Sequence, residues 1–124
     1  MLKMKRRETG NLGEKLAQVY LEQRGYTVVE TNYRCPSGEI DIIAKIDGYL
    51  VFVEVRSKRS AEYGSAEESI TPSKKAHLID SAAYYYQTHE DLPDLYRIDF
   101  VGVEIGRDNM PLRINLIENA ITES

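Results

Sequence analysis

The sequence predicts an α/β fold in which a mixed β-sheet is flanked by helices, in the order α-β-β-β-α-β-β. Two segments, 11–24 and 72–88, carry apolar residues at helical spacing. The dipeptide Asp47-Gly48 lies between two runs rich in β-branched residues and is typical of a two-residue hairpin turn. The second helical segment follows the third strand-like run and permits a parallel crossover, whereas the hairpin must be antiparallel. At 124 residues we expect one domain, residues 1–124.

The first helix is expected to run from Asn11 to Arg24, after a flexible basic arm formed by residues 1–9. Asn11 is a candidate N-cap, and Glu14 stands three residues later, which is the spacing of a capping box. Gly25 supplies a left-handed stop at the other end. The residues expected on the buried face are Leu12, Leu16, Ala17, Val19, Tyr20 and Leu21.

The second helix is expected to begin at the cap Thr71 and to end near Thr88, because Pro72 suits its first position. Segment 57–70 has no periodicity, so we expect a working loop there. The side chains expected to face inward from this helix are Ile79, Ala82, Ala83 and Tyr86. Strand-like runs are expected at 26–33, 39–45, 49–56, 95–105 and 112–117.

The charge is distributed unevenly along the chain, although the net value is only −4. Residues 1–59 carry a balance of +3 and residues 60–124 a balance of −7, so basic clusters in the first half are candidate phosphate contacts. No run of about 18 apolar residues is present, which excludes a transmembrane helix. We expect no secretory signal, and the single cysteine, Cys35, suits a reducing cytoplasm.

The hairpin turn fixes a register that gathers charged side chains on one face. If Asp47-Gly48 form the loop, Asp41 lies opposite Glu54, and Glu39 lies opposite Arg56. Opposed like charges destabilise a strand pair, and burial makes the pair less stable still. The side chains expected on the other, core-facing side are Ile40, Ile42, Ala44, Val51, Val53 and Val55.

Two kinds of compensation remain open for the opposed carboxylates. A divalent cation such as Mg²⁺ takes carboxylate oxygens together with water and phosphate. Alternatively, Asp41 or Glu54 binds a neighbouring lysine, arginine or backbone N–H, or is exposed. From the residues alone we favour a metal for Asp41 with Glu54, and an ion pair with Arg56 for Glu39.

The motifs around this hairpin resemble those of the YraN-type family of small bacterial proteins. The resemblance implies a restriction-endonuclease-like fold, similar to archaeal Holliday-junction resolvases. It extends over most of the chain, from about Gly10 to Val103. The motifs that carry it are Gly38-Glu39-Ile40-Asp41-Ile42-Ile43-Ala44, Val51-Phe52-Val53-Glu54-Val55-Arg56-Ser57-Lys58-Arg59, Gly13-Glu14, Lys75 and Arg97-Ile98-Asp99-Phe100-Val101.

The resemblance also implies roles for individual residues. Asp41 and Glu54 match the metal ligands for Mg²⁺ or Mn²⁺, and the backbone carbonyl of Val55 matches a third ligand. Glu14 matches a helix glutamate near the metal. Arg56 stands where the wider superfamily has lysine, and arginine stays protonated and cannot act as a base. The metal would then have to activate water, while Arg56 would hold the phosphate.

Three of the matched positions have structural alternatives. Glu14 is also a candidate capping-box carboxylate, and the two roles are compatible. Lys75 faces the site by the resemblance, or is an exposed lysine in the first turn of the helix. Asp99 is interpreted as a structural group paired with Arg97 on the same strand face.

The leading functional hypothesis is a metal-dependent DNA endonuclease that hydrolyses phosphodiester bonds, with branched or structured DNA as a candidate substrate. Lys58, Arg59 and Lys75 would contact phosphates. The alternative is a non-catalytic nucleic-acid-binding module on the same fold, favoured by Arg56 and by the acidic C-terminal half. A partner-binding scaffold, based on the tyrosine run 84–86, ranks third. A homodimer would supply two symmetric sites for a junction, and no membrane partner is expected.

Overall fold

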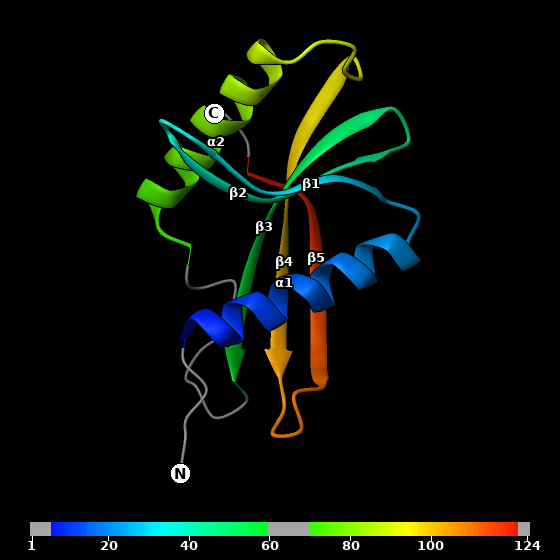
Figure 1. Cartoon of the computed structure of the whole chain (residues 1–124), viewed down its shortest axis with the longest axis vertical. Coiled ribbons are helices and arrows are strands. Elements are labelled where there is room, and N and C mark those ends of the chain that lie inside the picture. The colour runs from blue at the N-terminus through cyan, green and yellow to red at the C-terminus, as the bar shows by residue number, and fades with distance from the viewer. Residues whose placement is uncertain (1–5, 60–69, 122–124) are drawn as a thin grey trace.

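The structure is a computed structural model that describes residues 6–59 and 70–121 (Figure 1). It confirms the predicted α/β fold, in which a mixed five-stranded sheet carries two helices. Residues 60–69, which make up most of the expected working loop, lie outside the described residues, and residues 57–59 belong to a strand. The elements are α1 (Arg6–Gln23), β1 (Thr27–Cys35), β2 (Gly38–Ile46), β3 (Tyr49–Arg59), α2 (Pro72–Thr88), β4 (Leu95–Ile105) and β5 (Pro111–Ile121).

The strands are ordered β1-β2-β3-β4-β5, so β3 is the central strand of the sheet. β3 pairs with β4 in parallel, and the other neighbouring strands pair antiparallel. Successive side chains of β3 point to opposite faces: Val51 and Val53 pack in the cluster that contains α1, whereas Leu50 and Phe52 pack in the cluster that contains α2. The helices therefore cover opposite faces of the sheet.

Helix α1 begins at Arg6, five residues before the expected start, so Asn11 lies inside the helix and is not its N-cap. Residues 6–9 are consequently helical, and only residues 1–5 of the expected arm lie outside the described part. Gly10, a poor helix former, is therefore also accommodated inside the helix. The buried face contains Ala17 and Leu21 as predicted, but Val19 is 51% exposed.

Gly13 allows α1 to approach the central strand unusually closely. A β-carbon at this position would overlap the Ser57 hydroxyl oxygen on β3. Only glycine fits this contact without displacing one of the two elements. The next residue of the helix, Glu14, is therefore held beside the middle of the sheet.

The predicted start of α2 is confirmed. The Thr71 hydroxyl oxygen accepts a hydrogen bond from the Lys74 N–H at 3.2 Å, and Pro72 occupies the first turn. The fully buried face, however, is displaced by one residue from the prediction. Instead of being centred on Ile79, Ala82, Ala83 and Tyr86, it consists of Leu78, Ser81, Ala82 and Tyr85.

The β2–β3 hairpin has the predicted register near its turn and then divides. Its pairs run from Ile46↔Tyr49 to Ile42↔Val53, and the backbone pairing ends there. Figure 1 shows the two strands together near their shared turn and separated beyond it. Ile40 packs in the α2 cluster while Ile42 packs in the α1 cluster, so the prediction that both share one face is wrong. Asp41 lies between them, at the fork.

Candidate active site

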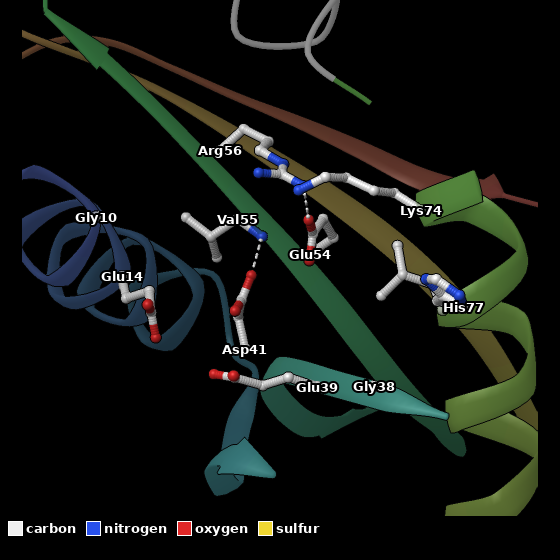
Figure 2. Close-up of a pocket in the computed structure, with 11 residues that line it drawn as sticks. Gly10, Glu14, Gly38, Glu39, Asp41, Glu54, Val55, Arg56, Lys74 and His77 are labelled. Carbon is white, nitrogen blue, oxygen red and sulfur yellow. Dashed lines mark hydrogen bonds and ion pairs between the residues drawn. The ribbon is translucent and has the colours of Figure 1, made fainter. Parts of the chain in front are cut away.

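A cavity of about 370 Å³ lies at this fork, between the part of α1 that carries Gly10 and Glu14, the N-terminal end of α2 and the separating strands β2 and β3 (Figure 2). The residues predicted for the catalytic and metal site all line it, which are Glu14, Asp41, Glu54, Val55 and Arg56. The structure thus brings together residues that are 42 positions apart at most in the chain. The space lies where β2 and β3 no longer pair.

Asp41 and Glu54 form a close pair of carboxyl groups in the cavity. Glu54 is only 7% exposed, and Asp41 is half-buried. Burial, the charge of Glu54 and a hydrogen bond between the two side chains raise the pKa of Asp41 to about 8. Near neutral pH the pair therefore retains a proton that an exposed aspartate would have lost.

The backbone of Val55 also contacts the carboxylate pair, through Asp41. Because β2 has left the ladder, the Val55 N–H has no strand partner on that side, and Asp41 Oδ2 accepts its hydrogen bond at 2.8 Å. This contact opposes the rise in the pKa of Asp41. The N–H and C=O of one strand residue point to the same side, so the Val55 carbonyl is also directed toward the fork.

Arg56 neutralises Glu54, with Nη2 lying 2.9 Å from Glu54 Oε2. Its Nε is buried and has no hydrogen-bond partner among the described residues. The predicted ion pair between Arg56 and Glu39 is wrong. Glu39 instead lies 3.6 Å from Arg34, because the parting of the strands carries it away from β3. Glu54 is therefore paired with an arginine, and Asp41 accepts a hydrogen bond from a backbone N–H. These are the contacts expected from the alternative to a metal ion.

Glu14 reaches the cavity from α1 (Figure 2). Its Oε1 accepts a hydrogen bond from Asn32 Nδ2 at 2.7 Å. Burial raises the pKa of Glu14, the Asn32 amide lowers it, and the charges of Asp41 and Glu39 raise it further. The capping-box interpretation is wrong, because the helix has already completed two turns before this residue.

Besides Arg56, the basic residues that line the cavity are Lys74 and His77, and both come from α2. Lys74 extends toward the Glu54–Arg56 pair (Figure 2). Lys75, the residue predicted from the sequence, is exposed and is not part of the lining. The signal that identifies Lys74 is the helical phase, since it lies one turn before the buried Leu78.

The other two predicted phosphate contacts lie beyond the cavity on β3. Arg59 Nη1 donates to the Gly106 carbonyl at 3.2 Å and to Asn109 Oδ1 at 2.8 Å, so it holds the turn between β4 and β5. Lys58 precedes it on the strand. Neither residue lines the carboxylate cavity.

The oxygen donors at the fork are of the kind that hard cations bind. Among the described residues, no group of three or more His, Cys, Asp or Glu side chains is placed to hold a metal ion. Two carboxylates and the Val55 carbonyl leave the remaining positions to water and phosphate. Mg²⁺ sites are commonly of this kind, so the residues present fit such an ion.

The central strand, the divided hairpin and the paired carboxylates define the class, which is an α/β protein of restriction-endonuclease-like architecture. Residues 13–103 match the model of the uncharacterised protein family UPF0102, and the chain belongs to this family. This is the YraN-type family that the motifs predicted.

Curated UPF0102 proteins resemble the chain over nearly its whole length. A relative from Dehalococcoides mccartyi is 51% identical over 120 residues, covering 95% of this chain and 96% of the relative. One from Caldicellulosiruptor saccharolyticus is 44% identical over 117 residues, covering 94% and 99%. One from Roseiflexus castenholzii is 42% identical over 122 residues, covering 97% and 98%. The family match therefore spans the stretch of chain from α1 to β4, which contains Glu14, Asp41, Glu54, Val55 and Arg56.

Proposed function

We propose that this chain is a metal-dependent DNA endonuclease that hydrolyses phosphodiester bonds with Mg²⁺ or Mn²⁺. The observation that carries the proposal is the pairing of Asp41 with Glu54 in a cavity that is open to a ligand. Two adjacent, poorly hydrated carboxylates are unfavourable in a folded protein, and a hard cation relieves their repulsion. Branched or structured DNA is the first substrate to test.

Different residues of the chain would bind the cation and the phosphate. Asp41, Glu54 and the Val55 carbonyl hold the cation, which when bound supplies an activated water and neutralises phosphate charge. Arg56 cannot accept a proton. Its guanidinium, once Glu54 binds the cation, can turn to the phosphate oxygens and stabilise the charge that develops there. Lys74 approaches from α2 and provides a second positive charge.

Titration calorimetry with Mn²⁺ tests the cation site directly. We expect weak binding to the wild type and none to Asp41→Asn, because the variant keeps the side-chain shape but loses a charged ligand. Asp80→Asn is the matched control, since Asp80 is exposed on α2 and does not line the cavity. Equal Mn²⁺ binding by the wild type and Asp41→Asn would contradict the assignment.

A second candidate function is a nucleic-acid-binding module without catalysis. The contact that favours it is the ion pair in which Arg56 already neutralises Glu54. Cleavage of a four-way DNA junction, with and without Mn²⁺, separates the two functions. Mn²⁺-dependent cleavage supports the endonuclease, whereas tight binding with no cleavage supports the module.

We further propose where the chain acts and in which oligomeric state. Neither α1 nor α2 is long and apolar enough to cross a membrane, and these are the helices within the described residues. Cys35 is free, and we place the function in the cytoplasm, where thiols stay reduced. We also propose a homodimer on junction DNA, because two symmetric cuts need two sites. Sedimentation of the protein with and without a junction measures this.

A further inference from the structure

A second cavity of about 370 Å³ adjoins the first, between α1 and β1. Glu14 lines both cavities, so they share one wall. The fully buried Ile42 also lines the second cavity. Its volume lies within the roughly 300–1,000 Å³ typical of sites for small organic ligands. The polar residues that complete the lining are Asn11, Lys15, Gln18, Thr31 and Asn32.

The chemistry of the second cavity differs from that of the first. Asn11, Gln18 and Asn32 contribute amide groups, each of which both donates and accepts hydrogen bonds. The edges of nucleobases present donors and acceptors in the same way. Within the described residues, the side chains of Asn11, Lys15 and Gln18 form no hydrogen bond or ion pair with one another or with a neighbour. These groups are therefore available to a ligand.

Asn32 fixes the wall between the two cavities. It has a left-handed backbone, with φ of 53°, which asparagine tolerates better than most residues. Its Nδ2 donates to Glu14 Oε1 at 2.7 Å and lies 3.5 Å from Glu39 Oε1. The carboxylates consequently face one side of this wall and the free amides face the other. Because the two cavities share Glu14, a phosphodiester held at the carboxylates would have a neighbouring nucleotide within reach of the second cavity.

We propose that the second cavity is a subsite for one unpaired nucleotide next to the phosphodiester that is bound at Asp41 and Glu54. This inference rests on the proposed function and names its substrate class. A base inside a duplex cannot enter such a cavity, because its pairing edge is occupied and its faces are stacked. The substrate is then DNA with an unpaired nucleotide, as at a bulge or an open branch point, rather than continuous duplex.

Fluorescence anisotropy with two DNA probes tests the subsite. One probe is a duplex with a single-nucleotide bulge, and the other is the fully paired duplex, both in Ca²⁺. We expect the wild type to bind the bulged probe about tenfold more tightly than the paired duplex, which is the gain in affinity expected from hydrogen bonds to one base. The double variant Asn11→Ala/Gln18→Ala should bind both probes equally. Gln23→Ala is the matched control on the same helix, because Gln23 is exposed and lines neither cavity.

An unchanged preference in the double variant overturns the subsite, and so does the absence of any preference in the wild type. Thermal melting checks that the variants fold, which alanine in a helix favours. Mn²⁺-dependent cleavage of the same probes is measured in parallel. Preference without cleavage refutes the endonuclease and retains the subsite, whereas cleavage without preference refutes the subsite alone.

Discussion

Asp99 on β4 and Asp41 on β2 are both aspartates of the sheet interior, yet their surroundings are opposite. Asp99 is fully buried and accepts hydrogen bonds from the Tyr26 hydroxyl at 3.0 Å, from Arg97 Nε at 3.0 Å and from the Asn119 N–H at 2.8 Å. Its charge is thus compensated and its oxygens are occupied. The sequence-based interpretation of Asp99 as a structural partner of Arg97 is confirmed.

Asp41 has one donor, the Val55 N–H, and its other neighbour is the carboxyl group of Glu54. It also faces a cavity, whereas Asp99 faces only protein. A buried polar group is normally satisfied by its surroundings, so an incompletely satisfied pair at a cavity is a candidate for binding or chemistry. The decisive difference lies in the missing donors, because Asp99 is the more deeply buried of the two and is nevertheless satisfied.

The largest expected effect is at Asp99. Asp99→Ala should lower the free energy of unfolding by about 3–5 kcal/mol, because it leaves the Tyr26 hydroxyl and the Asn119 N–H without their acceptor and removes the buried partner of Arg97, which keeps only Glu118 and Tyr26. Urea denaturation measures the change. Asp80→Ala is the control on exposed surface and should change stability by less than about 0.5 kcal/mol. A loss below about 1 kcal/mol for Asp99→Ala would contradict the structural role.

Whereas removing the charge of Asp99 should destabilise the protein, removing the charge of Asp41 should stabilise it at alkaline pH. In the folded state the pKa of Asp41 is about 8, against an ordinary value of 3.8. Between these values the folded chain holds a proton that the unfolded chain releases, so stability falls as the pH rises from about 4 to 8. Asp41→Asn lacks this titration. We expect it to be more stable than the wild type at pH 8, by about 2 kcal/mol, and similar at pH 4.

Urea denaturation of both proteins across this pH range measures the difference. Mn²⁺ at pH 8 should stabilise the wild type and leave Asp41→Asn unchanged, since only the wild type offers both carboxylates. Parallel pH profiles for the two proteins would show that Asp41 has no raised pKa. The contrast with Asp99 would then fail.

The sequence predicted those features that depend on neighbours along the chain. Asp47-Gly48 set the hairpin register as far as Ile42↔Val53, and Asp41 and Glu54, the next residue on each strand, lie close together. Thr71 and Pro72 marked the start of α2. These signals are local, because turn and cap residues act through their own backbone geometry.

The features that the sequence did not predict depend on packing between distant elements. Nothing in the alternation of β2 shows that it leaves β3 at Asp41, because Ile40 and Ile42 are equally apolar. The ion pair of Glu39 with Arg56 failed for that reason. Likewise, α2 carries apolar residues on two neighbouring faces, and the sequence does not show which of them is buried. Because the buried face differs by one residue from the predicted one, Lys74 lines the cavity in place of Lys75. Only the packed structure selects the phase.

The last prediction concerns Arg56. Its substitution should have a smaller effect than those above and should change both the Mn²⁺ affinity and the cleavage rate. Arg56→Ala removes the positive charge beside Glu54, so Mn²⁺ should bind more tightly while cleavage falls by about tenfold, since the charge on the phosphate is no longer stabilised. Arg56→Lys keeps the charge and should retain or raise the cleavage rate, although it loses the fork that binds phosphate in two places.

Single-turnover cleavage of a junction at saturating Mn²⁺ compares the three proteins at position 56, and calorimetry gives their Mn²⁺ affinities. Saturation matters because tighter Mn²⁺ binding in Arg56→Ala could otherwise conceal a slower chemical step. If folded Arg56→Ala cleaves as fast as the wild type, the guanidinium makes no contribution to catalysis. Its function would then be confined to neutralising Glu54 in the absence of a cation, which is the structural role that Arg97 has beside Asp99.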